Sequence, residues 1–208
     1  MALYATDHGD FYPYSGGSGF SYWPNFLGHY TKTSYFPMVS VNGGSTTQYG
    51  AKVISCPSAA TPVIDDEYGS RAYGMVAFSA YGASAGARRW TTNNNHLLFG
   101  DPWVSAPGLN SPGDYIKSTK MKQMSEFILF ADSSFAITHA TYAGQDRCYF
   151  FLHADWASSS YGLSLRHSGR ANMAFYDGHA ASRNQAGVKG GVMKVLYGIS
   201  AEGLFREF

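Results

Sequence analysis

Hydrophobic and polar residues alternate in three short runs near the C-terminal end of the chain, at 163–166, 172–176 and 179–182. A period of two residues is typical of β-strands with one buried and one exposed face. The runs are separated by segments that contain glycine, which favours tight turns. The pattern therefore predicts three consecutive antiparallel strands, a β-meander.

Two turns are expected within this meander. Asp177-Gly178 is the stronger signal, because a type I′ turn requires positive φ at both central positions. The other turn is expected at 168–170, directly after His167. At about 3.3 Å per residue, the strand between the turns would separate His167 from Asp177 by about 20 Å. We therefore interpret His167, Asp177 and Gly178 as a structural motif that marks the two ends of one strand, and not as a catalytic pair.

Further hydrophobic runs extend the predicted sheet. The run 127–131 is apolar throughout, which favours a central strand that is covered on both faces. Residues 73–78, 148–152 and 192–197 are further strand candidates, and the last of them is alternatively a helical turn. We expect an α+β fold in which a C-terminal antiparallel sheet of about five to six strands carries long loops.

The N-terminal half of the chain shows little periodicity. Residues 1–9 are expected to form the end of an N-terminal helix, and residues 10–115 a loop-rich region rich in glycine and proline. The sheet is expected within 116–208, and the whole chain, 1–208, is expected to form a single domain. Three segments are expected to be loops or connections: 34–49, 101–103 and 133–144.

Composition narrows the function classes. The chain has 208 residues and a formal net charge of +1, and only 14% of its residues are charged. Lys and Arg are scattered, with Arg88-Arg89 as the only adjacent basic pair, so nothing indicates a nucleic-acid partner. The 24 glycines and the 16% of aromatic residues are typical of a turn-rich protein and fit an extracytoplasmic setting.

The chain has two cysteines, Cys56 and Cys148. Their spacing is not that of a zinc site. In an oxidising compartment they could form a disulfide that closes a loop of about 90 residues. The alternative is two buried free thiols.

Several segments resemble, in the same order along the chain, the prepilin-type H-X9-DG family. The signature matches at Arg166-His167 and again, after the nine-residue spacing, at Asp177-Gly178-His179. The other matching segments are Leu3 to Asp7 with Asp10 to Pro13, Trp23-Pro24 with Leu27 to Tyr30, Cys56-Pro57-Ser58, Tyr73-Gly74-Met75 and Ser125 to Ser133. The resemblance implies a pilin-like fold, like that of the type II secretion major pseudopilins, in which a long N-terminal helix packs on a C-terminal antiparallel sheet.

The resemblance also implies a function. It indicates a non-enzymatic, structural subunit of a pilus-like or type II secretion-like assembly, which contacts other pilin-like subunits and the membrane only through its N-terminal helix. The implied location is the periplasm or cell surface, with the full-length form anchored in the inner membrane. Family members carry an apolar helix of about 20 residues near the N-terminus. This chain begins with Met1-Ala2-Leu3-Tyr4, where that helix should end, so we expect most of the helix to be truncated here. The alternative is a soluble homologue without the helix.

A metal site is one alternative. Its candidate ligands are Asp132, His153, Asp155, His167, Asp177 and His179. The spacings His153-x-Asp155 and Asp177-x-His179 would place each pair on one face of a strand. Zinc would need three or four such groups to converge, and calcium would favour carboxylates and main-chain oxygens. The type II secretion major pseudopilins bind calcium in a C-terminal loop, but no Asp-rich loop here matches that pattern. We therefore expect no metal or cofactor, with calcium left open, and read these residues as polar groups at strand ends.

Catalysis and glycan binding are the remaining alternatives. The chain has no G-x-S-x-G elbow and no phosphate-binding loop, so we expect it not to be an enzyme. Exposed aromatic rings could bind sugars, with hydrogen bonds from 93–95. The aromatic candidates for such a glycan- or surface-binding module are Trp23, Trp90, Trp103 and Trp156.

Overall fold

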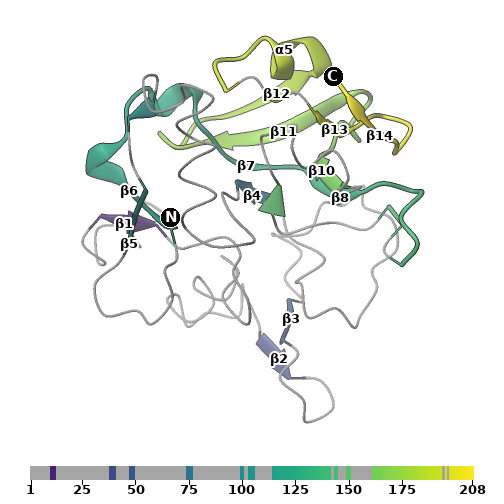
Figure 1. Ribbon diagram of the computed structural model, residues 1–208, viewed down its shortest axis with the longest axis horizontal. Helices are drawn as coiled ribbons and strands as arrows, with labels where there is room; N and C mark the ends of the chain where they lie inside the picture. Colours follow the sequence, from purple (N-terminus) through teal and green to yellow (C-terminus); the bar gives the residue numbers. More distant parts are fainter. Residues whose placement is uncertain are drawn as a thin grey trace.

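The computed structural model describes residues 10–12, 38–40, 47–49, 74–76, 99–100, 103–105, 114–141, 143–144, 149–150, 161–193, 195 and 197–208, which are drawn in colour in Figure 1. The strands in this part of the chain are β1 (Phe11–Tyr12), β2 (Met38–Ser40), β3 (Thr47–Tyr49), β4 (Gly74–Val76), β5 (Trp103–Ser105), β6 (Asp114–Lys117), β7 (Ile128–Ala131), β8 (Ser133–Phe135), β9 (Tyr149–Phe150), β10 (Tyr161–Leu163), β11 (Arg170–Phe175), β12 (Ala180–Asn184), β13 (Tyr197–Ile199) and β14 (Phe205–Glu207). The helical elements there are the 3₁₀ turns η2 (Ser118–Lys120) and η3 (Met124–Glu126) and the α-helix α5 (Gln185–Lys189).

A five-stranded sheet forms the centre of the described structure, with the strand order β12-β11-β7-β4-β9. Its pairs are antiparallel except β4 with β9, which is parallel. The predicted antiparallel sheet is thus confirmed in its coarser form, a sheet-rich and mostly antiparallel fold, and the parallel pair of β4 and β9 corrects the expectation that all pairs would be antiparallel. The smaller sheets are β1-β6-β5, β10-β8, β13-β14 and β2-β3.

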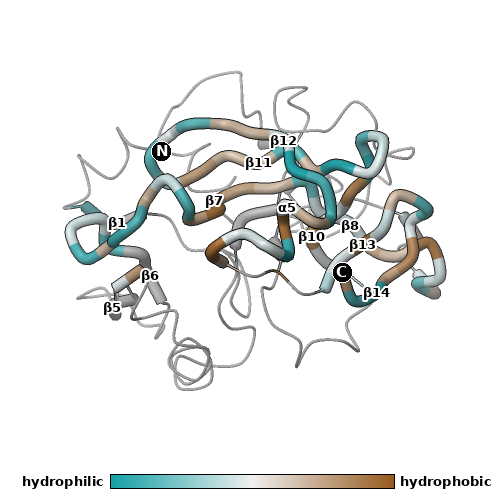
Figure 2. The backbone as a smooth tube through the Cα atoms, turned by 90° about the horizontal axis from the view of Figure 1, so that it is seen from above, coloured by the Kyte–Doolittle hydropathy of each residue, from teal (hydrophilic) through white to brown (hydrophobic). Residues whose placement is uncertain are grey.

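Strand β7 is central in this sheet, as its uninterrupted apolar run predicted. Ile128, Leu129 and Ala131 are all buried, and the strand lies between β11 and β4. Strand β11 alternates instead: Ala171, Met173 and Phe175 are buried, whereas the residues between them are exposed or half-buried. Figure 2 shows hydrophobic colours along much of β7 and β11, which run side by side. Each large apolar side chain buried here contributes about 1.5–3 kcal/mol to stability.

Aromatic side chains extend this core beyond the sheet. The rings of Phe99 and Phe127 meet edge to face with centroids 5.5 Å apart, and those of Phe127 and Tyr176 do so at 5.9 Å. Edge-to-face pairs add to area burial because the positive ring edge meets the negative ring face.

One extended segment, 128–135, pairs with both strands of a hairpin. That hairpin consists of β10 and β11, and His167 lies in the connection between them. The 128–135 segment consists of β7 and β8, interrupted at Asp132. Strand β11 pairs with β7, and strand β10 pairs with β8. The predicted meander is therefore only partly correct, because β10 and β11 are joined by a turn but do not pair along their lengths.

The run that begins at β10 is buried on both faces, although its alternation predicted one exposed face. Leu163, Ser164 and Leu165 are all at most 2% exposed. The Ser164 N–H donates to the Asp132 carbonyl at 2.8 Å, and the Leu165 N–H donates to the Ile199 carbonyl at 2.8 Å. Because neighbouring chain lies on both sides, the small Ser164 side chain is enclosed as fully as the two leucines.

The turn after His167 has the geometry that was expected at Asp177-Gly178. Ser168 and Gly169 both have positive φ, +52° and +77°. His167 and Arg170 exchange main-chain hydrogen bonds of 3.0 and 3.1 Å across them. These are the features of a two-residue type I′ turn.

The turn at Asp177-Gly178 is longer by one residue, so the type I′ prediction there is wrong. The Phe175 N–H donates to the His179 carbonyl, which leaves Tyr176, Asp177 and Gly178 as a three-residue loop. Of these three residues Gly178 alone has positive φ, +95°. The physical reason is that the Tyr176 N–H donates to the Phe127 carbonyl at 2.9 Å, which holds Tyr176 beside β7 and away from β12.

Other expectations are corrected or lie outside the described residues. Strands β2 and β3 occupy the segment 34–49, β5 begins at Trp103, and β8 lies in 133–144, all of which were expected to be loops or connections. Strand β4 confirms the strand predicted in 73–78. The expected N-terminal helix, 1–9, lies outside the described residues. In the described part of the chain, no helix is long and apolar enough to span a membrane.

Candidate functional site

Asp132 lies at the junction where the hairpin meets the 128–135 segment. Its side chain is fully buried, and its Oδ2 accepts a hydrogen bond of 2.6 Å from the Asn172 N–H. Its main chain binds both arms of the hairpin, because its N–H donates to the Asn172 carbonyl at 3.0 Å and its carbonyl accepts from the Ser164 N–H. One residue therefore fixes the register of β10 and β11 on the same segment.

His167 contacts this carboxylate. Its Nε2 lies 3.3 Å from Asp132 Oδ2, and its side chain is 25% exposed. The neighbouring Arg166 donates through Nη2 to the Ser133 carbonyl at 3.0 Å. The structure thus brings together two of the candidate ligands, Asp132 and His167, that sequence spacing had not paired.

The electrostatics of Asp132 show that burial outweighs its favourable contacts. Burial raises the pKa of the Asp132 carboxyl above its ordinary value, although the Asn172 N–H, His167 and Arg166 each act to lower it. Oδ1 is buried and has no hydrogen-bond partner. An ionised carboxylate at this position is therefore costly, since only one of its two oxygens is satisfied.

Asp177 and His179 form a second pair, in the loop between β11 and β12. Asp177 Oδ1 lies 2.6 Å from His179 Nδ1 and accepts the His179 N–H at 3.1 Å. The hydrogen bond from the His179 N–H, followed by that from its ring, lowers the pKa of Asp177. The His179 ring also stacks on Phe175, with centroids 4.2 Å apart. The i, i+2 spacing was expected to place these two residues on one face of a strand, but they lie in the loop between β11 and β12, where their side chains meet.

The two pairs do not combine into one site. His167 precedes β11 and Asp177 follows it, so the length of the strand, about 20 Å, lies between them. Within the described ranges, no group of three or more His, Cys, Asp or Glu side chains could hold a metal ion. Several predicted site residues or their side chains lie outside the described part: His153, Asp155, Cys56, Cys148, Trp23, Trp90, Trp103 and Trp156.

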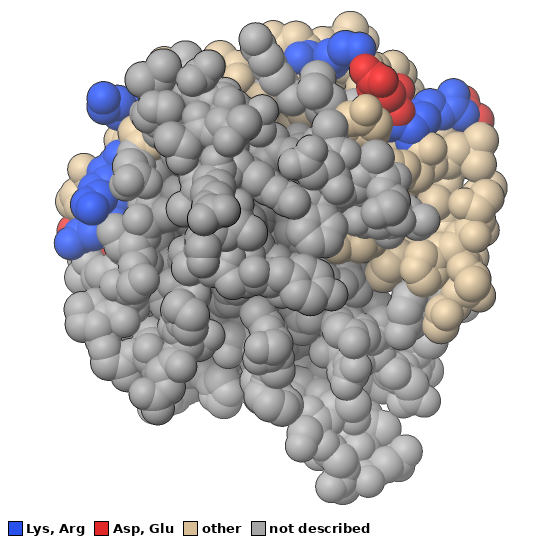
Figure 3. All heavy atoms as spheres, viewed as in Figure 1, with Lys and Arg blue, Asp and Glu red and all other residues tan. Residues whose placement is uncertain are grey.

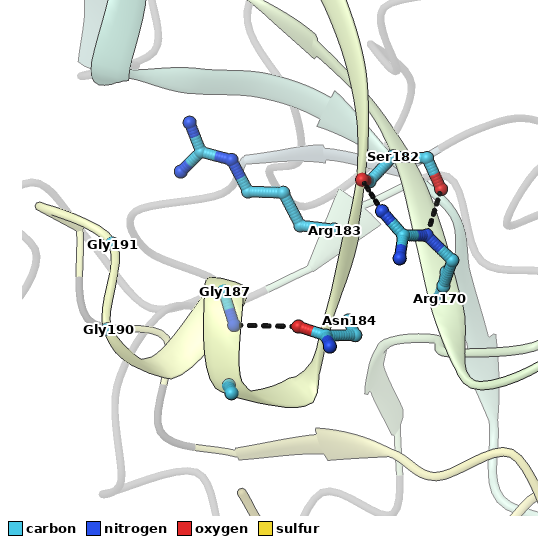
Figure 4. A pocket seen from close by; sticks show the side chains of 8 residues that line it. Arg170, Ser182, Arg183, Asn184, Gly187, Gly190 and Gly191 are labelled. Atoms are coloured by element: carbon cyan, nitrogen blue, oxygen red, sulfur yellow. Dashed lines mark hydrogen bonds between the residues drawn. The ribbon is translucent and has the colours of Figure 1, made fainter.

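A hollow beside strand β12 was not anticipated from the sequence. It has a volume of about 610 Å³, and we call it the β12 hollow. Figure 4 shows that its lining combines polar side chains of β11 and β12 with the glycine-rich segment at and after α5. The residues that define it are Arg170, Ser182, Arg183, Asn184, Gly187 and Gly191. A signal was present in the sequence, because Arg183 directly precedes a segment with three glycines, but nothing in the pattern showed that Arg170 would lie beside it.

Comparison with known proteins adds no relative. No family model, no curated protein and no solved structure matches this chain.

Proposed function

We propose that this chain is the globular sheet domain of a pilin-like structural subunit, located outside the cytoplasm and without catalytic activity of its own. In the proposal, the full-length protein is anchored in the inner membrane by an N-terminal helix. That helix also packs against the helices of other subunits in a pilus-like or type II secretion-like assembly.

The observation that carries the proposal is the pairing of Asp132 with His167. These residues belong to two segments that resemble the same family, 125–133 and the H-X9-DG signature. The buried Asp132 carboxylate lies 3.3 Å from the partly exposed His167 ring. The same two segments also pair as strands, with Met173 opposite Ala131. A motif whose members hold two strands in register supports an architectural role.

The positions of the remaining signature residues support the same interpretation. Gly178 supplies a positive φ that closes the loop after β11, and Asp177 accepts hydrogen bonds within that loop. Figure 3 shows the charged side chains of the described residues in small groups of both signs around the rim of this view.

The proposal is tested in cells that carry the native gene. Antibodies against this chain are used for membrane fractionation and for immunogold electron microscopy. We expect the protein in the inner-membrane fraction or on surface filaments. Protein confined to the cytosol, with no membrane-bound or filamentous fraction, would contradict the proposal.

A second arm addresses the absence of catalysis. The purified chain is screened against esters, glycosides and phosphate esters, and any turnover is compared with that of His167→Gln. A variant that loses turnover without a lower melting temperature would show that His167 acts chemically, and the architectural role would then be wrong.

A further inference from the structure

The β12 hollow lies along the outer edge of the five-stranded sheet. Strand β12 is the terminal strand of that sheet, and Ala180, Ser182 and Asn184 are exposed. An edge strand presents unpaired main-chain N–H and C=O groups to its surroundings. The register with β11 determines which residues present them.

Ser182 directs its main-chain groups into the hollow. It lies opposite Asn172 in β11. The Asn172 N–H donates to Asp132 Oδ2 and the Asn172 carbonyl accepts the Asp132 N–H, so both groups of Asn172 face β7. Asn172 and Ser182 are therefore a non-hydrogen-bonded pair of the antiparallel ladder, and the Ser182 N–H and C=O point away from β11.

Arg170 binds the acceptors of Ser182 and leaves its donor open. Its Nη2 donates to the Ser182 carbonyl at 2.5 Å, and its Nε donates to Ser182 Oγ at 3.2 Å. These two bonds hold the guanidinium against the strand edge, as Figure 4 shows. Because the Ser182 carbonyl is occupied, this edge is poorly suited to pairing with another strand, which needs donors and acceptors in alternation. What remains is a surface of donors: the Ser182 N–H and the other N–H groups of Arg170.

The charged side chains around the hollow also favour a ligand that accepts hydrogen bonds. Among the described residues, no carboxylate lines the hollow, and Arg170 forms no ion pair with any of them. Arg183 extends from the opposite face of β12, where it lies 4.7 Å over the Phe175 ring and 3.4 Å from Glu126. Gly191 keeps the space beside Arg183 open, because a Cβ there would lie 3.0 Å from Arg183 Nη1.

We infer that the β12 hollow binds an oxyanion, either free or as the carboxylate or sulfate of an acidic saccharide. The Ser182 N–H would donate in the plane of the sheet, and the pre-positioned guanidinium of Arg170 would donate from one side. A guanidinium held in place loses less conformational entropy when it binds an anion than a free one does. This inference is independent of the proposed structural function, and either can fail without the other.

The test is an NMR titration of the full chain with three probes: inorganic sulfate, inorganic phosphate and galacturonate. The readout is the amide shift of Ser182 and Asn184, with binding constants fitted for the wild type, Arg170→Gln and Arg206→Gln. Arg206 is the matched control, because it is an arginine with a 46% exposed side chain on β14 and its substitution removes the same charge. Melting curves confirm that each variant is folded.

In the wild type we expect saturable shifts at the amides of Ser182 and Asn184. The affinity fitted from them should be at least about fivefold lower for Arg170→Gln and unchanged for Arg206→Gln. Tighter binding of galacturonate than of the inorganic ions would identify a saccharide carboxylate as the source, and the reverse order a free ion. Equal weakening in both variants would show non-specific charge attraction, and the absence of saturable shifts at these amides would show that no site exists. Either result overturns the inference.

Discussion

Replacement of Asp132 should separate two effects of its carboxyl group on stability. One is the hydrogen bond that it accepts from the Asn172 N–H, and the other is the cost of burying its charge. Asp132→Ala removes the acceptor for the Asn172 N–H, and that N–H then has no partner in the core. An unsatisfied buried donor costs about 1–3 kcal/mol. Loss of the contact with His167, which is 25% exposed, adds at most about 1 kcal/mol. We therefore expect Asp132→Ala to lower the free energy of unfolding by about 1–4 kcal/mol.

Asp132→Asn is the matched control, because it keeps an oxygen that can accept the Asn172 N–H and removes the buried charge. Burial raises the pKa of Asp132, so the folded state favours the protonated acid. The stability that this preference supplies is complete below the unfolded pKa, about 3.9, and is lost as the pH rises through the folded pKa. Relative to Asp132→Asn, the wild type should thus become less stable as the pH rises from about 3.5 towards neutrality.

Urea unfolding at a series of pH values, followed by tryptophan fluorescence and circular dichroism, measures these differences. Equal losses for the Ala and Asn variants would refute the role of the Asn172 hydrogen bond. A wild type that gains stability over Asp132→Asn as the pH rises would show that the contact with His167 outweighs burial, and the reasoning from desolvation would be wrong.

Three further predictions concern the turns and the C-terminal strands. Gly178→Ala should lower the free energy of unfolding by about 1–2 kcal/mol. The cause would be backbone strain at a φ of +95° and not a steric clash, since a Cβ there meets nothing within 4 Å; an unchanged stability in urea unfolding would refute this. Gly198→Ala should cost at least about 1–3 kcal/mol, because its Cβ would collide with the Phe208 ring and the Leu163 carbonyl; an unchanged melting temperature would contradict that packing. The pKa of Asp177 is lowered, so its contribution to stability is present above the unfolded pKa and lost as the pH falls through the folded one; Asp177→Asn should flatten this acid-side loss, and identical pH profiles would show that the His179 contacts contribute nothing.

The sequence predicted those features that depend on local pattern. The uninterrupted apolar run of β7 and the alternation of β11 each reflect which faces of a strand are covered, and both were recognised. Loop length could not be predicted in the same way. The loop at Asp177-Gly178 gains a residue because the Tyr176 N–H bonds to Phe127, a contact between distant parts of the chain.

The candidate site shows the same limit. The Asp177–His179 contact is local to one loop, whereas the contact of Asp132 with His167 depends on the break between β7 and β8. That break allows one hairpin to lie along both strands, and no residue pattern around Asp132 reveals it. The β12 hollow likewise depends on register, since only the pairing of Asn172 with Ser182 turns the Ser182 N–H outward.

A double-mutant cycle between Asp132 and His167 tests most directly whether the signature histidine is part of the architecture. Urea unfolding is measured at pH 6 for the wild type, Asp132→Asn, His167→Gln and the double variant. Residues in direct contact should show a coupling free energy of at least about 0.5 kcal/mol. Strictly additive effects, with His167→Gln as stable as the wild type, would contradict an architectural role for His167.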